Sequence, residues 1–541
     1  MNANRKYRGD VLIVGGGLAG LAAASDLLEQ GKHVVILERD RPEKLGGLAK
    51  ESFGGVMMVD TPLQRNSGIT DSPELAMSDW LSYAEFGEGD IWPQRWAETY
   101  VENSIEMIYE WLQARGVSFL PVVNWPERGI SRRGNSVPRW HIAWGTGHAI
   151  IESILDPLSR RKGSGKLEIH FGHRVNRLIQ IAGRIEGCAG VLENEGEDFE
   201  AKGDVVIVAA GGVCGGDLSK VRANWFSEWG EPPEIILNGA HQFGDGLLHD
   251  VVSGLGGKVT HLDKQWHYAA GIHHPQSKRP NDGLSLVPPR SALWVNANGK
   301  RIGSPPLQGF TDTRYLVQEI CKQPSGMSWQ ILNWKIAIKE LAVSGAEYME
   351  SFRHKRKIQM ALDLVFGNRR LVKRMIQEAK DFVTADSLPE LVNRMNTLET
   401  RHQVDVNLLG AEIAAYDEEI ERSPELFQDE QLKRLVEFRK YRGDRIRLCK
   451  FQKINDPKAF PLIAIREFIL SRKSLGGIQT DLHCRVLNHE GEPIPGLLAI
   501  GESAGFGGGG IHGLRSLEGT FLGGCILTGR MAAKAISRGF S

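Results

Sequence analysis

Three glycines and one acidic residue near the start of the chain have the types and spacing of a dinucleotide-binding site. Gly15, Gly17 and Gly20 form the pattern G-x-G-x-x-G, and Glu38 follows at a distance typical of such sites. The first glycine permits a tight turn, the second lets the backbone approach a pyrophosphate, and the third lets a helix pack on a strand. Glu38 can accept a hydrogen bond from a ribose hydroxyl. The pattern predicts a bound dinucleotide and by itself leaves NAD and FAD open.

The residues around these glycines predict the βαβ unit that such a site requires. Residues 10–14 are an apolar run typical of a buried strand, residues 21–30 have the pattern of a helix, and residues 33–37 resemble a second buried strand. The helix N-terminus would then face the phosphate charge. Leu18 and Ala19 lie in the turn before this helix and are also expected to contact the cofactor.

Two later segments favour FAD over NAD. Residues 205–212 and 496–505 each read as a buried strand that runs into glycines, although almost the whole chain separates the second from the first motif. A site assembled from residues so far apart needs one sheet interrupted by a long insertion, which suits the extended FAD molecule. A glycine-rich run from Gly505 precedes residues 514–536, which have helical periodicity, so we expect a second helix to begin beside the third strand.

Composition excludes several classes of protein. The 541 residues hold 66 Lys plus Arg and 66 Asp plus Glu, so the formal charge of +0 favours neither a nucleic-acid partner nor a polybasic membrane anchor. The 6 cysteines form no C-x-x-C pair, and His267, His273 and His274 lack the spacing of a metal site. We expect no metal, no disulfide framework and no transmembrane segment, and a cytoplasmic protein.

The sequence changes character between residues 266 and 470. Segments 351–380 and 431–450 are basic, whereas segment 411–430 is acidic. We expect a helical domain whose charged faces pair with one another. The alternative is a basic dock for an acidic substrate or a redox partner.

Further motifs resemble a family of flavoproteins. They are Lys44–Gly55, Gly244–Gly246, Ser474–Asp481 and Gly501–Gly505. With the first glycine motif, they resemble the superfamily of fumarate reductase, succinate dehydrogenase and 3-ketosteroid dehydrogenases over nearly the whole chain. The stretches Asn135–Gly147, Trp266–Tyr268 and Tyr441–Arg445 are similar to a bacterial group described only as FAD-binding dehydrogenases.

The resemblance implies an α/β fold with a Rossmann-like FAD-binding domain in two segments. These are residues 8–265 and 471–541, and they enclose an inserted α+β cap domain of residues 266–470. Boundaries of this kind follow the changes in composition along the chain.

The resemblance also implies the cofactor contacts. The glycines 15, 17 and 20 would hold the pyrophosphate and Glu38 the adenosine ribose. The other implied contacts are Gly46, Gly47, Gly54 and Gly55 at the flavin, Val175 at the adenine, and Ala209, Gly211, Asp245 and Glu502 elsewhere. Gly519 and Thr520 would also contact the cofactor and would open the last helix. Relatives with covalent flavin have a histidine where this chain has Leu48, so dissociable FAD is expected.

Departures from the family are equally informative. The stretch matching the catalytic arginine of fumarate reductases is Gly309–Thr313, and another of their substrate-binding arginines falls at Ser516. The position of a catalytic tyrosine of ketosteroid dehydrogenases holds Ile463, which has no proton to transfer. Neither mechanism can therefore be carried over unchanged.

Three residues remain as candidates for catalysis. Tyr268 is the leading acid/base candidate, with an aromatic wall as the alternative role. Arg472 occupies the place where the family faces substrate and could stabilise an enolate, although an ion pair between domains would explain it equally. His141 is a candidate site residue, or a structural histidine within a Trp-rich cluster.

The sequence thus predicts an FAD-dependent oxidoreductase acting on a CH-CH group next to a carbonyl. The expected small-molecule substrate is apolar, such as a steroid or another cyclic ketone. The alternatives are a non-redox flavoprotein, either hydratase or isomerase, and an electron-transferring flavoprotein subunit. The electron acceptor is left open between a quinone, a carrier protein and oxygen.

Overall fold

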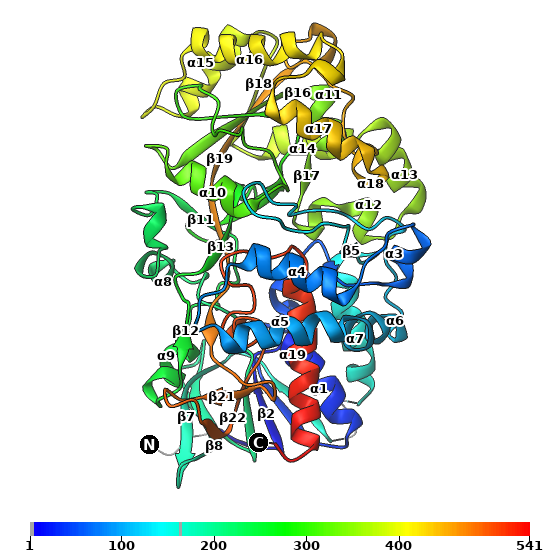
Figure 1. The fold of residues 1–541 in the computed structure, drawn as a ribbon. Helices are drawn as coiled ribbons and strands as arrows, with labels where there is room; N and C mark the ends of the chain where they lie inside the picture. The colour runs from blue at the N-terminus through cyan, green and yellow to red at the C-terminus, as the bar shows by residue number, and fades with distance from the viewer. Residues whose placement is uncertain (1–4, 162–164, 541) are drawn as a thin grey trace.

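Helices and strands are mixed along the whole chain in this computed structural model, which describes residues 5–161 and 165–540 (Figure 1). Both termini lie at the lower end of the molecule in Figure 1, and the helices of the inserted segment form its upper end. Among the described residues, no helix is both long enough and apolar enough to cross a membrane.

One sheet in the lower half of the molecule consists mainly of short parallel strands. Its order is β21-β22-β10-β2-β3-β6, and all neighbours are parallel except β21, which is antiparallel to β22. The strands are β2 (Val11–Val14), β3 (Val34–Leu37), β6 (Leu167–His170), β10 (Val205–Val208), β21 (Arg485–Leu487) and β22 (Pro493–Ala499). Strands β2, β3 and β10 are fully buried apolar runs, as a parallel sheet covered on both faces requires.

The two faces of this sheet are covered by different structures. Val11 and Ile13 pack on the side of α1 (Leu18–Glu29) and α19 (Thr520–Ser537), whereas Leu12 and Val14 pack with residues of a second sheet. That second sheet has the order β1-β9-β8-β7 and comprises β1 (Arg5–Arg8), β7 (His173–Ile181), β8 (Arg184–Leu192) and β9 (Asp198–Lys202). The alternation along β2 follows from the two-residue repeat of a strand.

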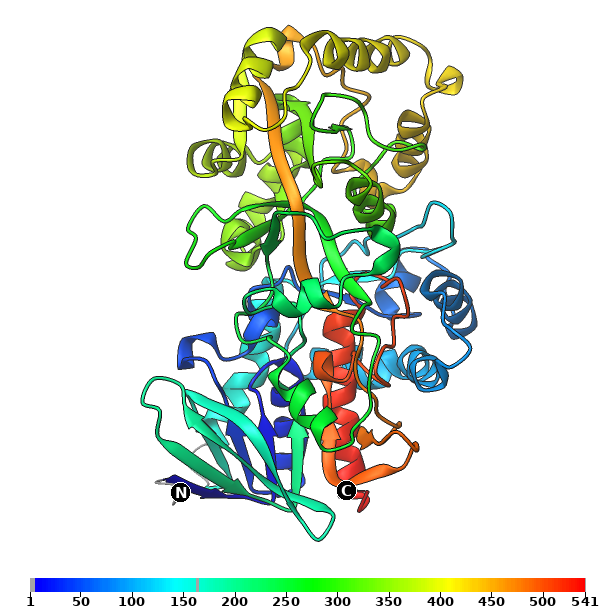
Figure 2. The same cartoon turned by 90° about the vertical axis from the view of Figure 1, so that its left-hand side faces the viewer.

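Residues 266–470 contribute most strands of a larger sheet, which also includes β11 from the preceding segment. Its order is β15-β16-β19-β13-β14-β17, and both β11 and β18 also pair with β19. The strands are β11 (Ile236–Asn238), β13 (Gln265–His273), β14 (Gly283–Val287), β15 (Leu293–Val295), β16 (Met327–Asn333), β17 (Ala342–Val343), β18 (Phe382–Ala385) and β19 (Leu462–Ser474). Figure 2 shows β19 in orange, running from the upper end of the molecule down to the lower half. The expected domain boundaries at 265/266 and 470/471 lie within β13 and β19, so both strands continue across them.

Helices and short strands surround these sheets. Before the insertion these are β4 (Gly55–Met57), β5 (Trp140–Ile142), β12 (Val259–Thr260), α2 (Gly47–Lys50), α3 (Pro62–Asn66), α4 (Pro73–Ala84), α5 (Ile91–Asn103), α6 (Trp111–Ala114), α7 (Thr146–Arg161), α8 (Ser219–Ala223) and α9 (Leu247–Gly254), and after it β20 (Gly477–Ile478). Within it are α10 (Thr313–Cys321), α11 (Trp334–Glu340), α12 (Glu350–Arg353), α13 (Lys357–Phe366), α14 (Arg369–Glu378), α15 (Leu388–Leu398), α16 (Val406–Ile420), α17 (Glu430–Lys440) and α18 (Arg442–Arg445). Some of the charged residues pair along one helix, as Arg374 does with Glu378 at 3.1 Å.

The last helix begins later than its sequence pattern suggests. The helical pattern from Leu514 starts the helix too early, because residues 514–519 form a loop, whereas the start at Gly519 and Thr520 that the resemblance implies is confirmed: Gly519 is the N-cap and α19 begins at Thr520. The flanking Gly513 and Gly519 have φ angles of 56° and 99°, a left-handed conformation that a right-handed helix cannot contain. This loop matters for the site because it carries Glu518.

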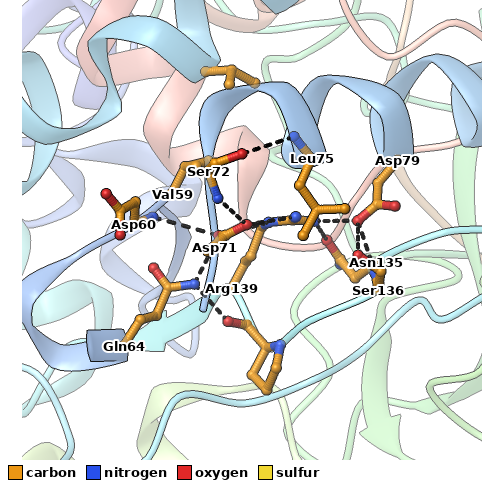
Figure 3. A network of polar contacts seen from close by, with 12 residues as sticks. Val59, Asp60, Gln64, Asp71, Ser72, Leu75, Asp79, Asn135, Ser136 and Arg139 are labelled. Carbon is orange, nitrogen blue, oxygen red and sulfur yellow. Dashed lines mark hydrogen bonds and ion pairs between the residues drawn. The ribbon is translucent and has the colours of Figure 1, made fainter. Parts of the chain in front are cut away.

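A buried ion-pair network fixes the chain that leads into β5 (Figure 3). Arg139 donates to Asp71 at 2.7 Å and to Asp79 at 2.6 Å, and all three side chains are fully buried. Asp79, on α4, also accepts a hydrogen bond from the Ser136 backbone N–H at 2.8 Å. The network therefore joins α4 to the segment before β5, with its charges paired and hydrogen-bonded.

Replacing the central arginine should strongly destabilise the protein. Arg139→Gln leaves the buried carboxylate of Asp71 without a cation and that of Asp79 with only the exposed Arg133, which costs about 3–5 kcal/mol. Arg133 is the matched control, because it contacts Asp79 at 2.9 Å but is 54% exposed, and loss of such a pair costs about 1 kcal/mol or less. Thermal unfolding followed by circular dichroism should show a large drop in Tm for Arg139→Gln and a small one for Arg133→Gln. Equal Tm values for the two variants would contradict this account.

Candidate functional site

Two cavities meet at the ends of the parallel strands. The empty space in the first cavity and at its mouth is about 1140 Å³, and that of the second is about 1150 Å³. Four residues line both of them: Leu48, Ala49, Glu502 and Cys525. One elongated ligand in the first cavity can therefore meet a second ligand at this junction.

Most of the expected cofactor contacts line these cavities. Those in the first cavity are Gly15, Gly17, Leu18, Ala19, Glu38, Gly46, Gly47, Val175, Ala209, Gly211, Asp245 and Glu502. The second cavity is lined by Glu502 again, with Gly55 and Gly519. The structure thus brings together residues from both ends of the chain, as the long insertion required.

The glycine turn has the geometry that a pyrophosphate site needs. A Cβ atom on Gly15 would lie 2.3 Å from the Ala209 carbonyl oxygen, and one on Gly20 would lie 2.2 Å from the Gly15 oxygen. Gly17 has no atom within 4 Å of its Cβ position, so its backbone is open to the cavity. Helix α1 begins at Leu18, and its unpaired N–H groups and dipole favour an anion at this point.

Glu38 lies at the end of β3 in the first cavity. Its carboxylate accepts hydrogen bonds from the Gly16 N–H at 2.6 Å and the Asp40 N–H at 2.7 Å. A carboxylate has further lone pairs for ribose hydroxyl groups. Farther along the wall, Arg39 holds Asp245 in an ion pair of 2.7 Å.

Three expected contacts, Gly20, Gly54 and Thr520, line neither cavity. Gly20 packs α1 on the turn, as described above. Gly54 packs against backbone, because a Cβ there would lie 2.5 Å from the Gly147 nitrogen. The Thr520 hydroxyl donates to the Leu517 carbonyl and contacts His512 at 2.8 Å. These residues support the walls of the cavities through packing and local hydrogen bonds.

Tyr268 lies in the second cavity within a cluster of ionisable groups. Its hydroxyl donates to Glu518 at 3.1 Å and accepts a hydrogen bond from Lys473 at 3.0 Å. The pairing of β13 with β19 shifts register on both sides of Tyr268, and such bulges redirect side chains next to active sites. We refer to Tyr268, Lys473 and Glu518 as the tyrosine cluster.

Burial governs the electrostatics of this cluster. It lowers the pKa of Lys473 to about 8, against the opposing effect of Glu518. It also raises the pKa of Tyr268 well above its usual value, with the negative charge of Glu518 adding to the shift. Lys473 lies 3.8 Å from the centre of the Phe521 ring, a cation–π contact that compensates part of its lost hydration. Burial raises the pKa of Glu502 at the junction as well.

Two members of the tyrosine cluster were not predicted from the sequence. Lys473 follows the candidate Arg472, and Glu518 precedes the expected contact Gly519. In the sequence, only their adjacency to these two positions could have indicated that they lie in the site. The contacts with Tyr268 depend on strand pairing and on the 514–519 loop, which no local pattern shows.

Arg472 also lines the second cavity. Its guanidinium donates to the Gly239 carbonyl, and its buried Nε has no partner among the described residues. The side chain is therefore only partly satisfied by the protein. It can offer further N–H groups to an oxygen atom of a ligand.

His141 does not reach either cavity. Its side chain is fully buried, with Nε2 at 2.8 Å from the Thr61 hydroxyl and Nδ1 at 2.8 Å from the Arg139 carbonyl. Burial lowers its pKa to about 4. Both ring nitrogens thus lie at hydrogen-bonding distance from protein groups, and neither faces a cavity. We therefore correct the expectation of a catalytic role and assign His141 to the support of β5.

Comparisons with known proteins agree with this geometry. The model of the family described as FAD binding domain matches residues 10–522. A KsdD-like steroid dehydrogenase of Mycobacterium tuberculosis (strain CDC 1551 / Oshkosh) is 41% identical, over 97% of this chain and 95% of its own length. A KsdD-like steroid dehydrogenase of Mycolicibacterium smegmatis is 40% identical, over 95% of this chain and 96% of its own length. The structure of 3-ketosteroid delta1-dehydrogenase from Sterolibacterium denitrificans covers 98% of this chain and 100% of its own, with a TM-score of 0.72 and 16% identity, which shows the shared fold.

Removal of the Glu38 carboxylate should weaken the retention of FAD. We expect Glu38→Ala to raise the Kd for FAD by about 10-fold, because a charge-assisted hydrogen bond to a ribose hydroxyl is lost. Titration of the apoprotein with FAD, followed by quenching of flavin fluorescence, measures this change. Glu43→Ala is the matched control, since Glu43 is exposed on the neighbouring turn. An unchanged Kd in Glu38→Ala would refute the assignment of this carboxylate.

Proposed function

We propose, on the premise that this chain belongs to the FAD binding domain family, that it dehydrogenates a carbon–carbon bond next to the carbonyl of an apolar polycyclic ketone such as a 3-ketosteroid. The chain is an FAD-dependent oxidoreductase. The observation that carries the choice of substrate is the second cavity, whose aromatic and aliphatic walls surround the tyrosine cluster and adjoin the first cavity. An apolar ring system fits such walls, and the few polar groups are placed where a carbonyl and its neighbouring carbons would react.

The first cavity fits FAD through its open glycine turn, its acidic residue and its length. We assign the pyrophosphate to Gly15 and Gly17 with the start of α1, the adenosine ribose to Glu38, and the flavin ring to the junction of the two cavities. The chain binds FAD non-covalently, and Leu48 at the junction offers only a hydrocarbon side chain. In the same proposal, residues 8–265 and 471–541 form a Rossmann-like FAD-binding domain and residues 266–470 an α+β cap.

FAD, when bound, supplies the acceptor for the hydride removed from the substrate. The protein must then remove a proton from the carbon next to the carbonyl. Tyr268 is placed for this step, because its own hydroxyl proton can pass to Glu518 as its oxygen takes the proton of the substrate. Lys473 stabilises the negative charge that develops on the Tyr268 oxygen. Arg472 polarises the carbonyl and stabilises the enolate.

The alternatives considered from the sequence gain no specific observation from the described residues. A hydratase or isomerase would need no electron acceptor, and an electron-transferring subunit would need a docking surface. The substrate-sized second cavity beside the expected flavin position favours dehydrogenation over both. The electron acceptor itself is not assigned.

Loss of the Tyr268 hydroxyl should abolish most of the activity. We expect Tyr268→Phe to slow the reduction of bound flavin by 4-androstene-3,17-dione, a 3-ketosteroid, by about 100-fold or more, the usual contribution of general acid/base catalysis. Anaerobic stopped-flow absorbance of the flavin band measures the rate. Tyr315→Phe is the control, because that hydroxyl bonds the Pro305 carbonyl away from the two cavities. A Tyr268→Phe variant that keeps the wild-type rate would overturn the proposed mechanism, and wild-type flavin that no 3-ketosteroid bleaches would overturn the proposed function.

The rate of flavin reduction should fall as the pH rises through about 8. Burial lowers the pKa of Lys473 to about 8, so its stabilising positive charge is present below that pH and lost above it. The pH profile of the stopped-flow rate constant tests this expectation. In Lys473→Arg the cation persists at higher pH, and the falling limb should move upward. If the wild-type and Lys473→Arg profiles coincide, Lys473 does not control the reaction.

A further inference from the structure

A third cavity extends the second one into the cap. It encloses about 590 Å³ of empty space. It shares five wall residues with the second cavity: Phe53, Trp140, Val287, Pro288 and Phe310. The shared walls are entirely apolar, so a hydrophobic ligand in the second cavity can continue past them.

The far end of the third cavity is charged. Asp444 forms ion pairs with Arg128 and, at 2.7 Å, with Arg290. Glu340 accepts hydrogen bonds from the Ser291 N–H, the Ser291 hydroxyl and the Cys449 N–H, at 3.0, 2.7 and 2.8 Å. Both acids are thus engaged by protein groups.

Arg447 is the remaining charged residue in the wall of the third cavity, and it takes part in none of these contacts. Within residues 5–161 and 165–540, no hydrogen bond, ion pair or cation–π contact engages its guanidinium. Burial lowers the pKa of Arg447, and the positive charge of nearby Arg290 lowers it further, whereas the negative charges of Asp444 and Glu340 oppose part of this shift. A partly buried arginine of this kind retains its charge and gains most from an anionic partner.

We propose that the third cavity binds a carboxylate that the substrate carries at the end remote from its reacting ketone. Arg447 would bind this carboxylate through two parallel N–H···O bonds, the geometry that a guanidinium offers to a planar anion. The substrate class is therefore an amphipathic polycyclic keto acid, with its ketone at the tyrosine cluster and its acid at Arg447. This inference rests on the proposed function and names the substrate class more closely.

Turnover of a matched pair of substrates tests the inference. The probes are a 3-ketosteroid with a carboxylic acid on its D-ring side chain, in a short-chain and a long-chain form, and the methyl ester of each. We expect the wild-type protein to favour one of the acids over its ester by about 10-fold or more in the kcat/KM of dehydrogenation with an artificial electron acceptor. Arg447→Gln should lower kcat/KM for that acid by about 10-fold to 100-fold and leave the ester within about 2-fold.

Two further variants separate charge and geometry from loss of structure. Arg447→Lys keeps the positive charge without the planar fork and should retain part of the preference for the acid. Arg445→Gln removes an exposed arginine that is not part of the cavity wall, and it should behave as wild type with both probes. Flavin content and Tm of each variant establish that the protein is folded.

The outcomes distinguish this inference from the proposed function. Dehydrogenation of the esters without any preference for the acids, or an equal effect of Arg447→Gln on both probes, would overturn the inference alone. Isothermal titration calorimetry with the oxidised holoenzyme tests the carboxylate site without turnover. Arg447-dependent binding of the acid without flavin reduction would retain the site and overturn the proposed function. An acid that binds no more tightly than its ester would reject the site.

Discussion

The pairing of β13 with β19 is the constraint on which the site depends. The two strands are separated by almost the whole cap in sequence, and their antiparallel pairing sets Tyr268 opposite Leu470. The register shifts on both sides of Tyr268 turn its side chain toward Lys473 and away from the regular ladder. The two strands are neighbours in the larger sheet, and Figure 2 shows β19 in orange, running from the upper end of the molecule toward its middle. The fold thereby places Tyr268, Arg472 and Lys473, all from these two strands, in the wall of the second cavity.

The tyrosine cluster joins opposite charges through one hydroxyl group. The half-buried ammonium of Lys473 and the half-buried carboxylate of Glu518 each lose part of their hydration, and both form hydrogen bonds with the Tyr268 hydroxyl that lies between them. Glu518 reaches this position because α19 starts at Thr520, leaving residues 514–519 as a loop against the cavity. Glu518 can therefore line the second cavity because the helix begins only after it. The left-handed glycines that flank the loop make that start possible.

Local sequence patterns predicted most of the glycines and acidic residues in the wall of the first cavity, but only one member of the tyrosine cluster. The strand–turn–helix unit at Gly15, its acidic partner and the two distant glycine strands follow from buried runs and turn residues that act over short distances. Tyr268 and Arg472 were found through their places near the expected domain junctions. The positions of Lys473 and Glu518 beside Tyr268 were not predicted, because they depend on the register of β13 with β19 and on a loop between two left-handed glycines. His141 was proposed as a site residue because an aromatic stretch that ends in glycines has the same sequence pattern whether it lines a cavity or packs as a buried strand.

A crystal structure of the protein with FAD and a 3-ketosteroid would show whether the two cavities form one continuous site with the reacting groups at their junction. We expect the pyrophosphate on the Gly15–Gly20 turn and the flavin ring beside Leu48 and Glu502. We also expect the steroid in the second cavity, with the carbon next to its ketone in contact with Tyr268 and its ketone oxygen within hydrogen-bonding distance of Arg472. A steroid bound outside the second cavity, or a flavin ring that does not reach the junction, would show that the cavities do not form one site.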